Sequence, residues 1–415
     1  MLKKLTRVVL PLLLAVLLLT PVGLVGCGDN GGEEVGNKLI FGWDWDFTGR
    51  ATVGTTQLYT GLIDYLKMTK ETDPVPGVEI ETMTYDGKSD PARVIVGYKW
   101  LRDRGMDLFS CAPHDFKMLR SQLEDDNIPS FIGSTQLENL DAPLGVSLYG
   151  PPESQLEVIL DWIMDGWDVT VEGRKCKIGF VGLAGVPFYE AQRDFLLKVI
   201  DENPDELELT SVEMAPSTTT AWASEIARLK DSDYIAIGAS GPPSASFTIE
   251  ARQRGYHNRI VGPLESLMAF WSLVKSVVPP ADLDGCVSGF YFPWYNQEGT
   301  YITEVLAAMQ KYRSSEVDYF LGGTGYVCGW SYGTVLVDAL RRAADAVGGE
   351  NVTSMDLFQA LRETDMTVDG FGGFPWKVVP EANAFMRGVS LYEYKADVED
   401  WVLMQDYVIP STLGG

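Results

Sequence analysis

Aromatic and small polar side chains gather at the ends of several apolar runs in this sequence, where they could hold a small molecule. Indole and phenol rings supply apolar contact, hydroxyls supply hydrogen bonds, and histidine and glutamate add polar or charged groups, as in many ligand pockets. This chemistry is that of noncovalent binding. The candidate binding residues are Trp43, Trp45, Ser110, His114, Ser134, Thr135, Tyr189, Ser240, Glu265 and Trp294.

One short motif has the form of a catalytic site. Residues Gly329–Gly333 read Gly-Trp-Ser-Tyr-Gly and fit G-x-S-x-G, the turn that presents the nucleophilic serine of α/β-hydrolases. That turn needs a preceding strand and a later histidine. Residues Gly322–Gly325 have no strand pattern, and both His114 and His257 precede Ser331. We therefore expect that the protein is not an enzyme.

Metal, nucleotide and glycosidase chemistry are not indicated either. The sequence has no phosphate-binding glycine loop, dinucleotide fingerprint or H-E-x-x-H motif. Asp44 and Asp46 lie on one face of a predicted strand, but no opposing wall for a glycosidase pair can be recognised. Two histidines and widely separated cysteines give no metal-ligand spacing, so we expect neither metal nor cofactor. The cysteines whose disulfide pairing stays open are Cys111, Cys176, Cys286 and Cys328.

Alternating strand and helix patterns in the first part of the chain position the first candidates. Repeated strand–helix units predict an α/β fold with a parallel sheet covered by helices. Ligands of open parallel sheets bind at the carboxyl ends of the strands, where these candidates lie. The predicted strands are 39–43, 78–85, 107–110 and 130–132, and the predicted helices are 55–69, 91–104 and 116–124.

The pattern pauses near residues 145–152 and then restarts, which implies a second sheet of the same kind. Helices at 301–312, 326–347 and 355–362 could complete either sheet, and Val389–Tyr394 with Trp401–Tyr407 suits terminal antiparallel strands. The second series comprises a helix at 154–166, strands at 176–181, 207–214, 234–237, 259–261 and 289–294, and helices at 188–202, 221–229, 244–254 and 267–277.

The first 26 residues have the form of a lipoprotein signal peptide. Three basic residues precede an apolar run, and the sequence Leu24-Val25-Gly26-Cys27 suits cleavage before Cys27. We expect Cys27 to be lipid-modified and residues 27–37, rich in Gly, Glu and Asn, to form a flexible tether. The domain would then work on the outer side of the cytoplasmic membrane, bound to it only through this lipid.

The mature part of the chain is strongly acidic. Without residues 1–26 it has 30 Lys and Arg residues, three fewer than the 33 of the full chain, against 58 Asp and Glu, a formal charge of about −28. This charge disfavours nucleic acids and anionic lipids as partners. An anionic ligand would require local positive potential in its site.

Several short motifs follow one another in a specific order between residues 38 and 410. In this order they resemble the type I periplasmic binding proteins, specifically the branched-chain amino acid (leucine/isoleucine/valine-binding) family of ABC-transporter substrate-binding lipoproteins. Asp46-Phe47 departs from the family's Pro-Leu, and Ser110–Pro113 departs from its Gly-Pro-containing loop. The motifs are Phe47–Gly49, Gly77–Glu81, Tyr85-Asp86, Ser89–Ala92, Asn127–Pro129, Ser134-Thr135, Lys177–Val181, Tyr332-Gly333, Ala343-Ala344 and Tyr392–Tyr394.

The resemblance implies two Rossmann-like lobes with parallel sheets, joined by three hinge crossovers and closing on a ligand between them. The implied N-terminal lobe comprises residues 38–150 and about 292–368, and the C-terminal lobe comprises residues 151–291 and about 369–415. The three crossovers are expected near Tyr149–Pro152, Gly289–Trp294 and Met366–Gly370.

The resemblance also implies roles for four candidates. Ser134 and Thr135 match the hydroxyls that hold a ligand carboxylate, Glu265 matches the acid that meets an ammonium group, and Tyr189 matches an aromatic cover. The alternatives are that Ser134 and Thr135 cap a turn and that Glu265 is a solvated surface acid.

The other candidates also have plainer alternatives. One of Trp43 and Trp45 is expected in the core, and His114 could simply begin a helix. The concentration of aromatic residues could indicate a ligand bulkier or flatter than leucine, or packing across the hinge.

The function implied is capture of a small carboxylate-containing ligand, such as an amino acid, an aromatic acid or another organic acid, and its delivery to the permease of an ABC transporter. The protein is expected to act as a monomer. A lipid-anchored sensory domain that reports its ligand to a signalling partner is the alternative.

Overall fold

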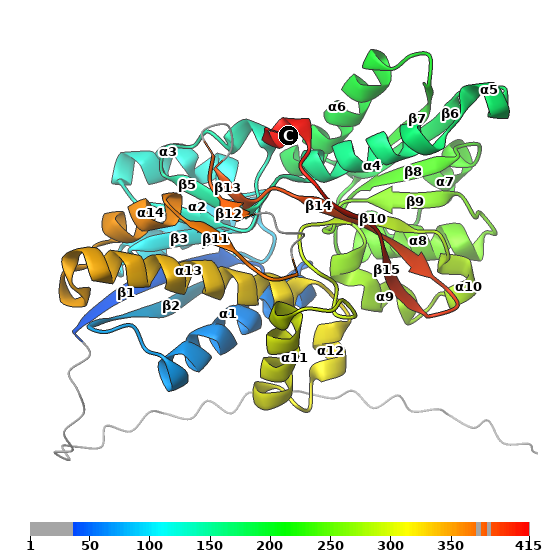
Figure 1. The fold of residues 1–415 in the computed structure, drawn as a ribbon. Coiled ribbons are helices and arrows are strands. Elements are labelled where there is room, and N and C mark those ends of the chain that lie inside the picture. The colour runs from blue at the N-terminus through cyan, green and yellow to red at the C-terminus, as the bar shows by residue number, and fades with distance from the viewer. Residues whose placement is uncertain (1–35, 371–374, 380–382, 415) are drawn as a thin grey trace, which may run out of the picture. The chain divides into compact units, whose positions relative to one another are not determined.

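The computed structural model describes residues 36–370, 375–379 and 383–414. The predicted signal peptide, Cys27 and nearly all of the tether lie outside these residues. The described part contains two lobes, each built on its own sheet (Figure 1). Both lobes have an α/β fold, as the sequence predicts.

The first lobe contains a six-stranded sheet in which every neighbouring pair is parallel. Its strands are β1 (Asn37–Trp45), β2 (Val78–Asp86), β3 (Leu108–Cys111), β4 (Ser130–Ile132), β5 (Gly145–Tyr149) and β13 (Ala384–Met386). Their order across the sheet is β13-β5-β4-β3-β1-β2. The strand–helix pattern of the sequence is interrupted where β5 forms, and the sequence analysis did not predict β13.

Helices cover both faces of this sheet. Successive residues of a strand point to opposite faces, so each strand contacts helices on both sides. The rings of Phe41 and Trp43 in β1 contact Tyr332 of helix α13 (Gly325–Val347), which packs against α1 (Thr52–Thr72). Asp44 points the other way, towards Gly97 of α2 (Pro91–Arg102). Helix α3 (Phe116–Asp126) packs beside α2.

The G-x-S-x-G motif lies inside α13 and serves close helix packing. A methyl group on Gly329 would lie 1.8 Å from the carbonyl oxygen of Leu58 in α1. Ser331 is fully buried and donates a hydrogen bond of 2.8 Å to the carbonyl of Val327 in its own helix. The motif therefore forms no strand-to-helix turn, and its glycines let the backbones of α1 and α13 approach.

The second lobe contains a seven-stranded sheet in the order β15-β14-β10-β9-β8-β6-β7. The run from β10 to β7 is parallel, and β14 and β15 are antiparallel, as predicted for the end of the chain. The strands are β6 (Cys176–Ala184), β7 (Leu207–Pro216), β8 (Tyr234–Gly238), β9 (Arg259–Gly262), β10 (Val287–Phe290), β14 (Val389–Lys395) and β15 (Asp400–Val408).

Short and long helices surround this second sheet. The two longest, α4 and α6, pack against each other, and α8 packs against α7 and α9. The helices are α4 (Pro152–Gly166), α5 (Val169–Glu172), α6 (Pro187–Glu202), α7 (Ala223–Leu229), α8 (Pro242–Gln253), α9 (Trp271–Lys275) and α10 (Pro280–Leu283).

The chain passes between the lobes three times. It crosses after β5, again after β10, and a third time between β13 and β14 at Arg387-Gly388. The third crossover was expected near Met366–Gly370, and the chain stays in the first lobe about 20 residues longer, because β13 pairs with β5 through Ala384 and Ser147. Residues 383–386 therefore belong to the first sheet, not to the C-terminal lobe as expected.

The remaining elements lie between the second and third crossovers. They are α11 (Thr300–Tyr312), α12 (Val317–Leu321), α14 (Ser354–Arg362) and a hairpin of β11 (Asp365–Thr367) and β12 (Pro375–Lys377). Helix α13 is in the same segment and packs on the first lobe through α1.

The crossovers are tied to one another where they pass. The Tyr291 hydroxyl donates a hydrogen bond of 3.1 Å to the carbonyl of Pro151, and the amide of Gly150 donates one of 3.0 Å to the carbonyl of Met386. The strand predicted at Gly289–Trp294 ends at Phe290.

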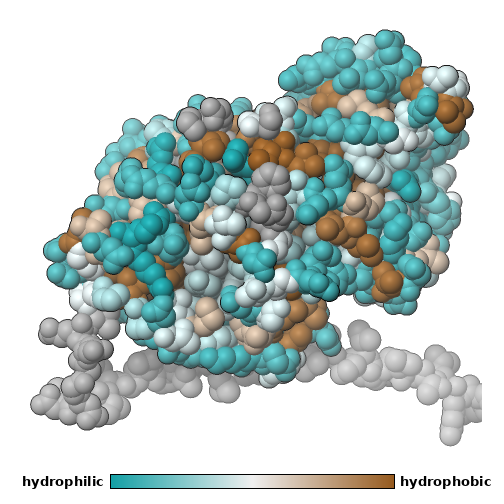
Figure 2. Space-filling view, viewed as in Figure 1, coloured by the Kyte–Doolittle hydropathy of each residue, from teal (hydrophilic) through white to brown (hydrophobic). Residues whose placement is uncertain are grey.

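Figure 2 shows mainly hydrophilic residues on the face it presents. In the described part of the chain, no helix is long and apolar enough to cross a membrane. Cys111, Cys176, Cys286 and Cys328 are all buried free thiols.

Candidate functional site

A cleft lined by both lobes lies at the carboxyl ends of their parallel strands. It consists of two adjoining cavities of about 430 and 480 Å³ that share Arg50, Ser89 and Ser217. The lining loops follow β1, β2 and β3 in the first lobe and β6, β7 and β8 in the second. This is the position at which open parallel sheets bind ligands.

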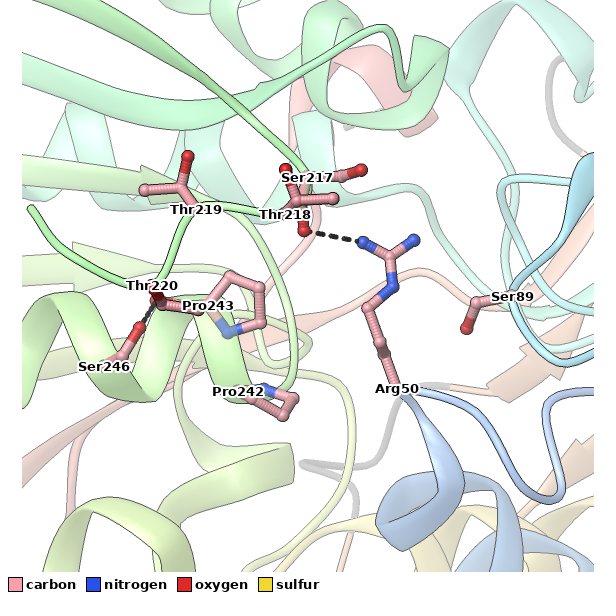
Figure 3. Close-up of a pocket in the computed structure, with 9 residues that line it drawn as sticks. All are labelled: Arg50, Ser89, Ser217, Thr218, Thr219, Thr220, Pro242, Pro243 and Ser246. Carbon is pink, nitrogen blue, oxygen red and sulfur yellow. Dashed lines mark hydrogen bonds between the residues drawn. The ribbon is translucent and has the colours of Figure 1, made fainter.

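Arg50 extends across the cleft between the two cavities (Figure 3). Its Nη1 atom donates a hydrogen bond of 3.0 Å to the carbonyl oxygen of Ser217 in the second lobe. Among the described residues no carboxylate forms an ion pair with this guanidinium, although the chain is strongly acidic. The remaining donors of its planar fork are suited to a carboxylate.

Two aspartates position the loop that carries Arg50. Asp46 accepts a hydrogen bond of 2.7 Å from the amide of Ala51 and another from the hydroxyl of Ser89. Asp86 accepts bonds of 3.0 and 3.2 Å from the amides of Phe47 and Thr48. The turn between β1 and α1 is therefore fixed by buried and half-buried carboxylates.

The other titratable residues of the first lobe's wall are His114, Asp115 and Lys117. The Nε2 atom of His114 lies 3.5 Å from a carboxylate oxygen of Asp115, and Lys117 forms a 2.5 Å ion pair with Glu138. Burial raises the pKa of Asp115, which the positive charge of His114 opposes and the negative charge of Asp46 supports. Lys117 is therefore already paired, and Arg50 is the lining cation without an ion-pair partner among the described residues.

The second lobe's wall contributes apolar groups and hydroxyls to the first cavity. Tyr189 is 6% exposed, and its hydroxyl hydrogen-bonds with that of Ser240. Burial raises the pKa of Tyr189 to about 12, which the Ser240 hydrogen bond opposes and the carboxylate of Glu265 supports, so the phenol stays neutral and can donate. The apolar lining of this wall consists of Leu183, Ala184, Val186 and Pro187.

The structure thus brings three of the predicted binding residues, His114, Tyr189 and Ser240, into one cavity. Trp45 and Ser110 do not line it; the indole Nε1 of Trp45 donates a 3.1 Å bond to the Ser110 hydroxyl. Ser110 is fully buried, and Trp43 is packed between Trp45, Tyr59 and Tyr332. Trp43 is therefore the core tryptophan of the pair.

Ser134 and Thr135 do not line either described cavity. Both are buried, and their hydroxyls bond within the protein: Ser134 to the carbonyl of Gly150 at 2.9 Å and Thr135 to the side-chain oxygen of Gln136 at 3.2 Å. In this arrangement they hold the strand end next to the first crossover.

Glu265 is half-buried and does not line either described cavity. Its Oε2 atom accepts a 3.3 Å bond from the amide of Gln155, whose Oε1 accepts from the amide of Leu264 at 2.9 Å. Its Oε1 atom is buried and has no hydrogen-bond partner among the described residues. Burial raises the pKa of Glu265 to about 7, and hydrogen bonding to its own backbone and to Gln155 opposes this. The carboxyl is not a solvated surface acid.

Trp294 packs in the second lobe, away from the cleft lining. Its indole Nε1 donates a 2.8 Å bond to Asp400 of β15, and its ring contacts Phe290 and Tyr295. The loop after β10 turns towards the terminal strands, which a local sequence pattern does not reveal.

Sequence reasoning missed Arg50, Ser89 and Ser217. The signal for Arg50 was present: a basic residue directly after a strand in an acidic chain is where local positive potential could arise. Ser217 contributes its carbonyl, which any residue type could provide, so its side chain carries no signal. In the described ranges, no group of three or more His, Cys, Asp or Glu side chains could hold a metal ion.

Comparison with protein families identifies the kind of protein. The sequence profile described as "Periplasmic binding protein" matches residues 40–399. The chain belongs to the periplasmic binding protein family. Members of this family bind solutes outside the cytoplasm, and the type I fold inferred from the motif order is confirmed. Curated proteins give no significant match to the sequence.

Solved structures of other periplasmic binding proteins share the fold at low sequence identity. A branched-chain amino acid ABC transporter protein from Thermus thermophilus with bound valine is 17% identical, with a TM-score of 0.78 over 91% of this chain and 97% of its own. A fatty acid ABC transporter substrate-binding protein from Thermomonospora curvata is 17% identical, with a TM-score of 0.74 over 91% and 94%. A solute-binding protein from R. palustris in complex with benzoate is 15% identical, with a TM-score of 0.73 over 91% and 99%.

Proposed function

We propose that this periplasmic binding protein captures a small carboxylate in the cleft between its lobes and delivers it to the permease of an ABC transporter. The observation that carries the proposal is the cleft itself: both lobes line it at their strand ends, and Arg50 spans it to Ser217. Ligand binding shifts the lobes towards the closed state, since only that state contacts the ligand from both sides.

The similar solved structures support this class of ligand. Those named above hold valine or benzoate, or belong to a fatty acid transporter, and each of these solutes carries a carboxylate. In this chain Arg50, His114, Tyr189 and Ser240 would contact the ligand, whereas Ser134, Thr135 and Glu265, which line neither described cavity, would support the strand end and the hinge. The protein would act as a monomer without catalysis, and Cys27 would anchor it to the membrane.

A thermal-shift screen of the mature domain tests the proposal. Amino acids, aromatic acids and short-chain carboxylates are added singly at millimolar concentration, and a ligand that binds only the native state must raise the melting temperature. We expect a shift with at least one carboxylate. No shift with any of them contradicts the proposed ligand class.

Two alanine variants then test the supporting residues. Thr135→Ala and Glu265→Ala should each lower the affinity for the best carboxylate of the screen indirectly, by loosening the strand end and the hinge, as calorimetry would measure. Unchanged affinity in both contradicts this supporting role.

A further inference from the structure

The charges that face the cleft are unevenly distributed. Arg50, His114 and Lys117 line it, whereas Asp115 is its one lining carboxyl among the described residues. Asp115 is 6% exposed and lies 3.5 Å from the Nε2 atom of His114, so little of its carboxyl is open to a ligand. The cavity therefore presents donors to an anion and offers little to a cation.

Arg50 is the basic group that remains available to a ligand. Lys117 is paired with Glu138, while Arg50 donates to the Ser217 carbonyl only through Nη1. Its other guanidinium N–H groups can hold both oxygens of a carboxylate, a geometry that lysine cannot reproduce. A carboxylate placed there lies at the junction of the two cavities.

An α-ammonium group next to that carboxylate would lack a partner. Glu265, the acid that the family resemblance assigns to an ammonium, does not line either described cavity. One of its oxygens is held by Gln155, and the other has no accessible surface. Leaving an ammonium without an acceptor in a closed cleft costs its desolvation free energy.

The body of the ligand would meet an apolar surface. Leu183, Ala184, Val186, Pro187 and the ring of Tyr189 form the second lobe's side of the first cavity, and Met118 adds to it from α3. An aromatic or branched aliphatic group fits this lining, because each apolar atom removed from water adds favourable free energy.

We propose that the cleft selects an apolar monocarboxylate without an α-ammonium group, and that Arg50 is the residue that determines this specificity by holding the carboxylate. This inference rests on the proposed function and narrows its ligand class.

Matched ligand pairs test the proposal. Calorimetry on the mature domain compares 3-phenylpropanoate with L-phenylalanine and 4-methylpentanoate with L-leucine, pairs that differ only in the ammonium group. We expect the acid without the ammonium to bind at least about tenfold more tightly in at least one pair, since an unpaired buried polar group costs about 1–3 kcal/mol.

The possible outcomes separate the two proposals. Tighter or equal binding of the amino acid in the pairs that bind overturns this inference but leaves carboxylate capture intact. No binding of any of the four compounds at millimolar concentration contradicts the inference, and only the wider thermal-shift screen then decides whether the function itself fails.

Variants connect the selectivity to Arg50. Arg50→Lys keeps the positive charge but lacks the planar guanidinium, and it should weaken binding of the preferred acid about tenfold. The circular dichroism spectrum and melting temperature should stay unchanged because Arg50 is exposed. Lys99→Met, on the exposed side of α2, is the matched control and should bind like the wild type. Equal affinity of Arg50→Lys and the wild type contradicts the assigned role.

Discussion

The two walls of the cleft differ in what they can recognise. The wall from the first lobe carries the titratable side chains Arg50, His114, Asp115 and Lys117, whereas the lining residues of the second lobe that the structure describes are apolar, hydroxyl-bearing, glycine or proline. The first lobe would therefore bind and orient a charged group. The second lobe would add apolar contact as the cleft closes, so that charge and shape are recognised by different halves of the chain.

Local structure explains this division. In the first lobe, Asp46 and Asp86 hold the turn before α1 so that Arg50 points across the cleft. In the second lobe, α6 and α8 begin with Pro187 and Pro242, a residue suited to the first helical turn because it has no N–H to satisfy there. The described lining of the second wall contains no ionisable side chain except the neutral phenol of Tyr189.

The largest expected effect is that of removing charge from the first wall. Arg50→Met should weaken a bound carboxylate about 10- to 100-fold, because hydrogen bonds to a charged partner contribute about 1.5–3 kcal/mol. Calorimetry with 3-phenylpropanoate measures it, with Lys99→Met as control. A loss below about threefold would mean that the first wall does not bind the charge.

The second prediction concerns Asp44, a carboxyl buried behind the charged wall. It is 1% exposed, neither carboxylate oxygen has a hydrogen-bond partner within the described residues, and burial raises its pKa to about 8, with further increases from Asp115 and Asp86 that Arg93 opposes. Between pH 4 and 8 the native state keeps a proton that the unfolded chain releases. The contribution of Asp44 to stability is therefore lost as the pH rises towards 8.

Asp44→Asn removes this titration. Its free energy of unfolding relative to the wild type should rise between pH 5 and 7, by at most about 1.4 kcal/mol per pH unit, and should match the wild type near pH 4. Urea unfolding at pH 5, 6 and 7 measures the difference, with the exposed Asp125→Asn as control. Parallel pH profiles for Asp44→Asn and the wild type would show that Asp44 is not held neutral.

A smaller effect is expected on the second wall. Tyr189→Ala should weaken 3-phenylpropanoate about 5- to 10-fold through lost apolar and aromatic contact. Tyr189→Phe keeps the ring and loses only the bond to Ser240, so its affinity should fall less than about threefold. If Tyr189→Phe weakens binding of the acid as much as Tyr189→Ala, the contact with the ligand depends on the hydroxyl of Tyr189 rather than on its ring.

The smallest effect should come from Lys117, although it belongs to the charged wall. It is exposed and already paired with Glu138, and exposed ion pairs contribute about 0–1 kcal/mol. Lys117→Ala should weaken the same acid less than about threefold and only at low salt. A loss of affinity as large as that of Arg50→Met would indicate that the ligand carboxylate binds near Lys117 of α3.

Long, regular patterns in the sequence predict the fold well. The two series of strands and helices, the ends of the strands at the cleft and the terminal antiparallel pair all follow from periodicity that reflects burial. His114, Tyr189 and Ser240 were found in the same way, since each follows a strand end. The strand β13 has only three residues and no period of its own, so only its pairing with β5 reveals it and moves the third crossover.

Features that depend on contacts between distant segments could not be predicted. Arg50 and Ser217 are 167 residues apart and meet only because the lobes face each other. The hydrogen bond from the Trp294 indole to Asp400 depends on a strand more than 100 residues later. Gly329 and Gly333 looked catalytic because close helix packing and a nucleophile turn both require glycine.

The most direct test of the division between the walls uses one ligand pair in two variants. Calorimetry would measure 3-phenylpropanoate and its uncharged amide, 3-phenylpropanamide, with the wild type, Arg50→Met and Tyr189→Ala. We predict that the wild type and Tyr189→Ala prefer the carboxylate by about tenfold or more, and that Arg50→Met has no preference. A preference that survives in Arg50→Met, or disappears in Tyr189→Ala, would contradict the recognition of charge by the first lobe and of shape by the second.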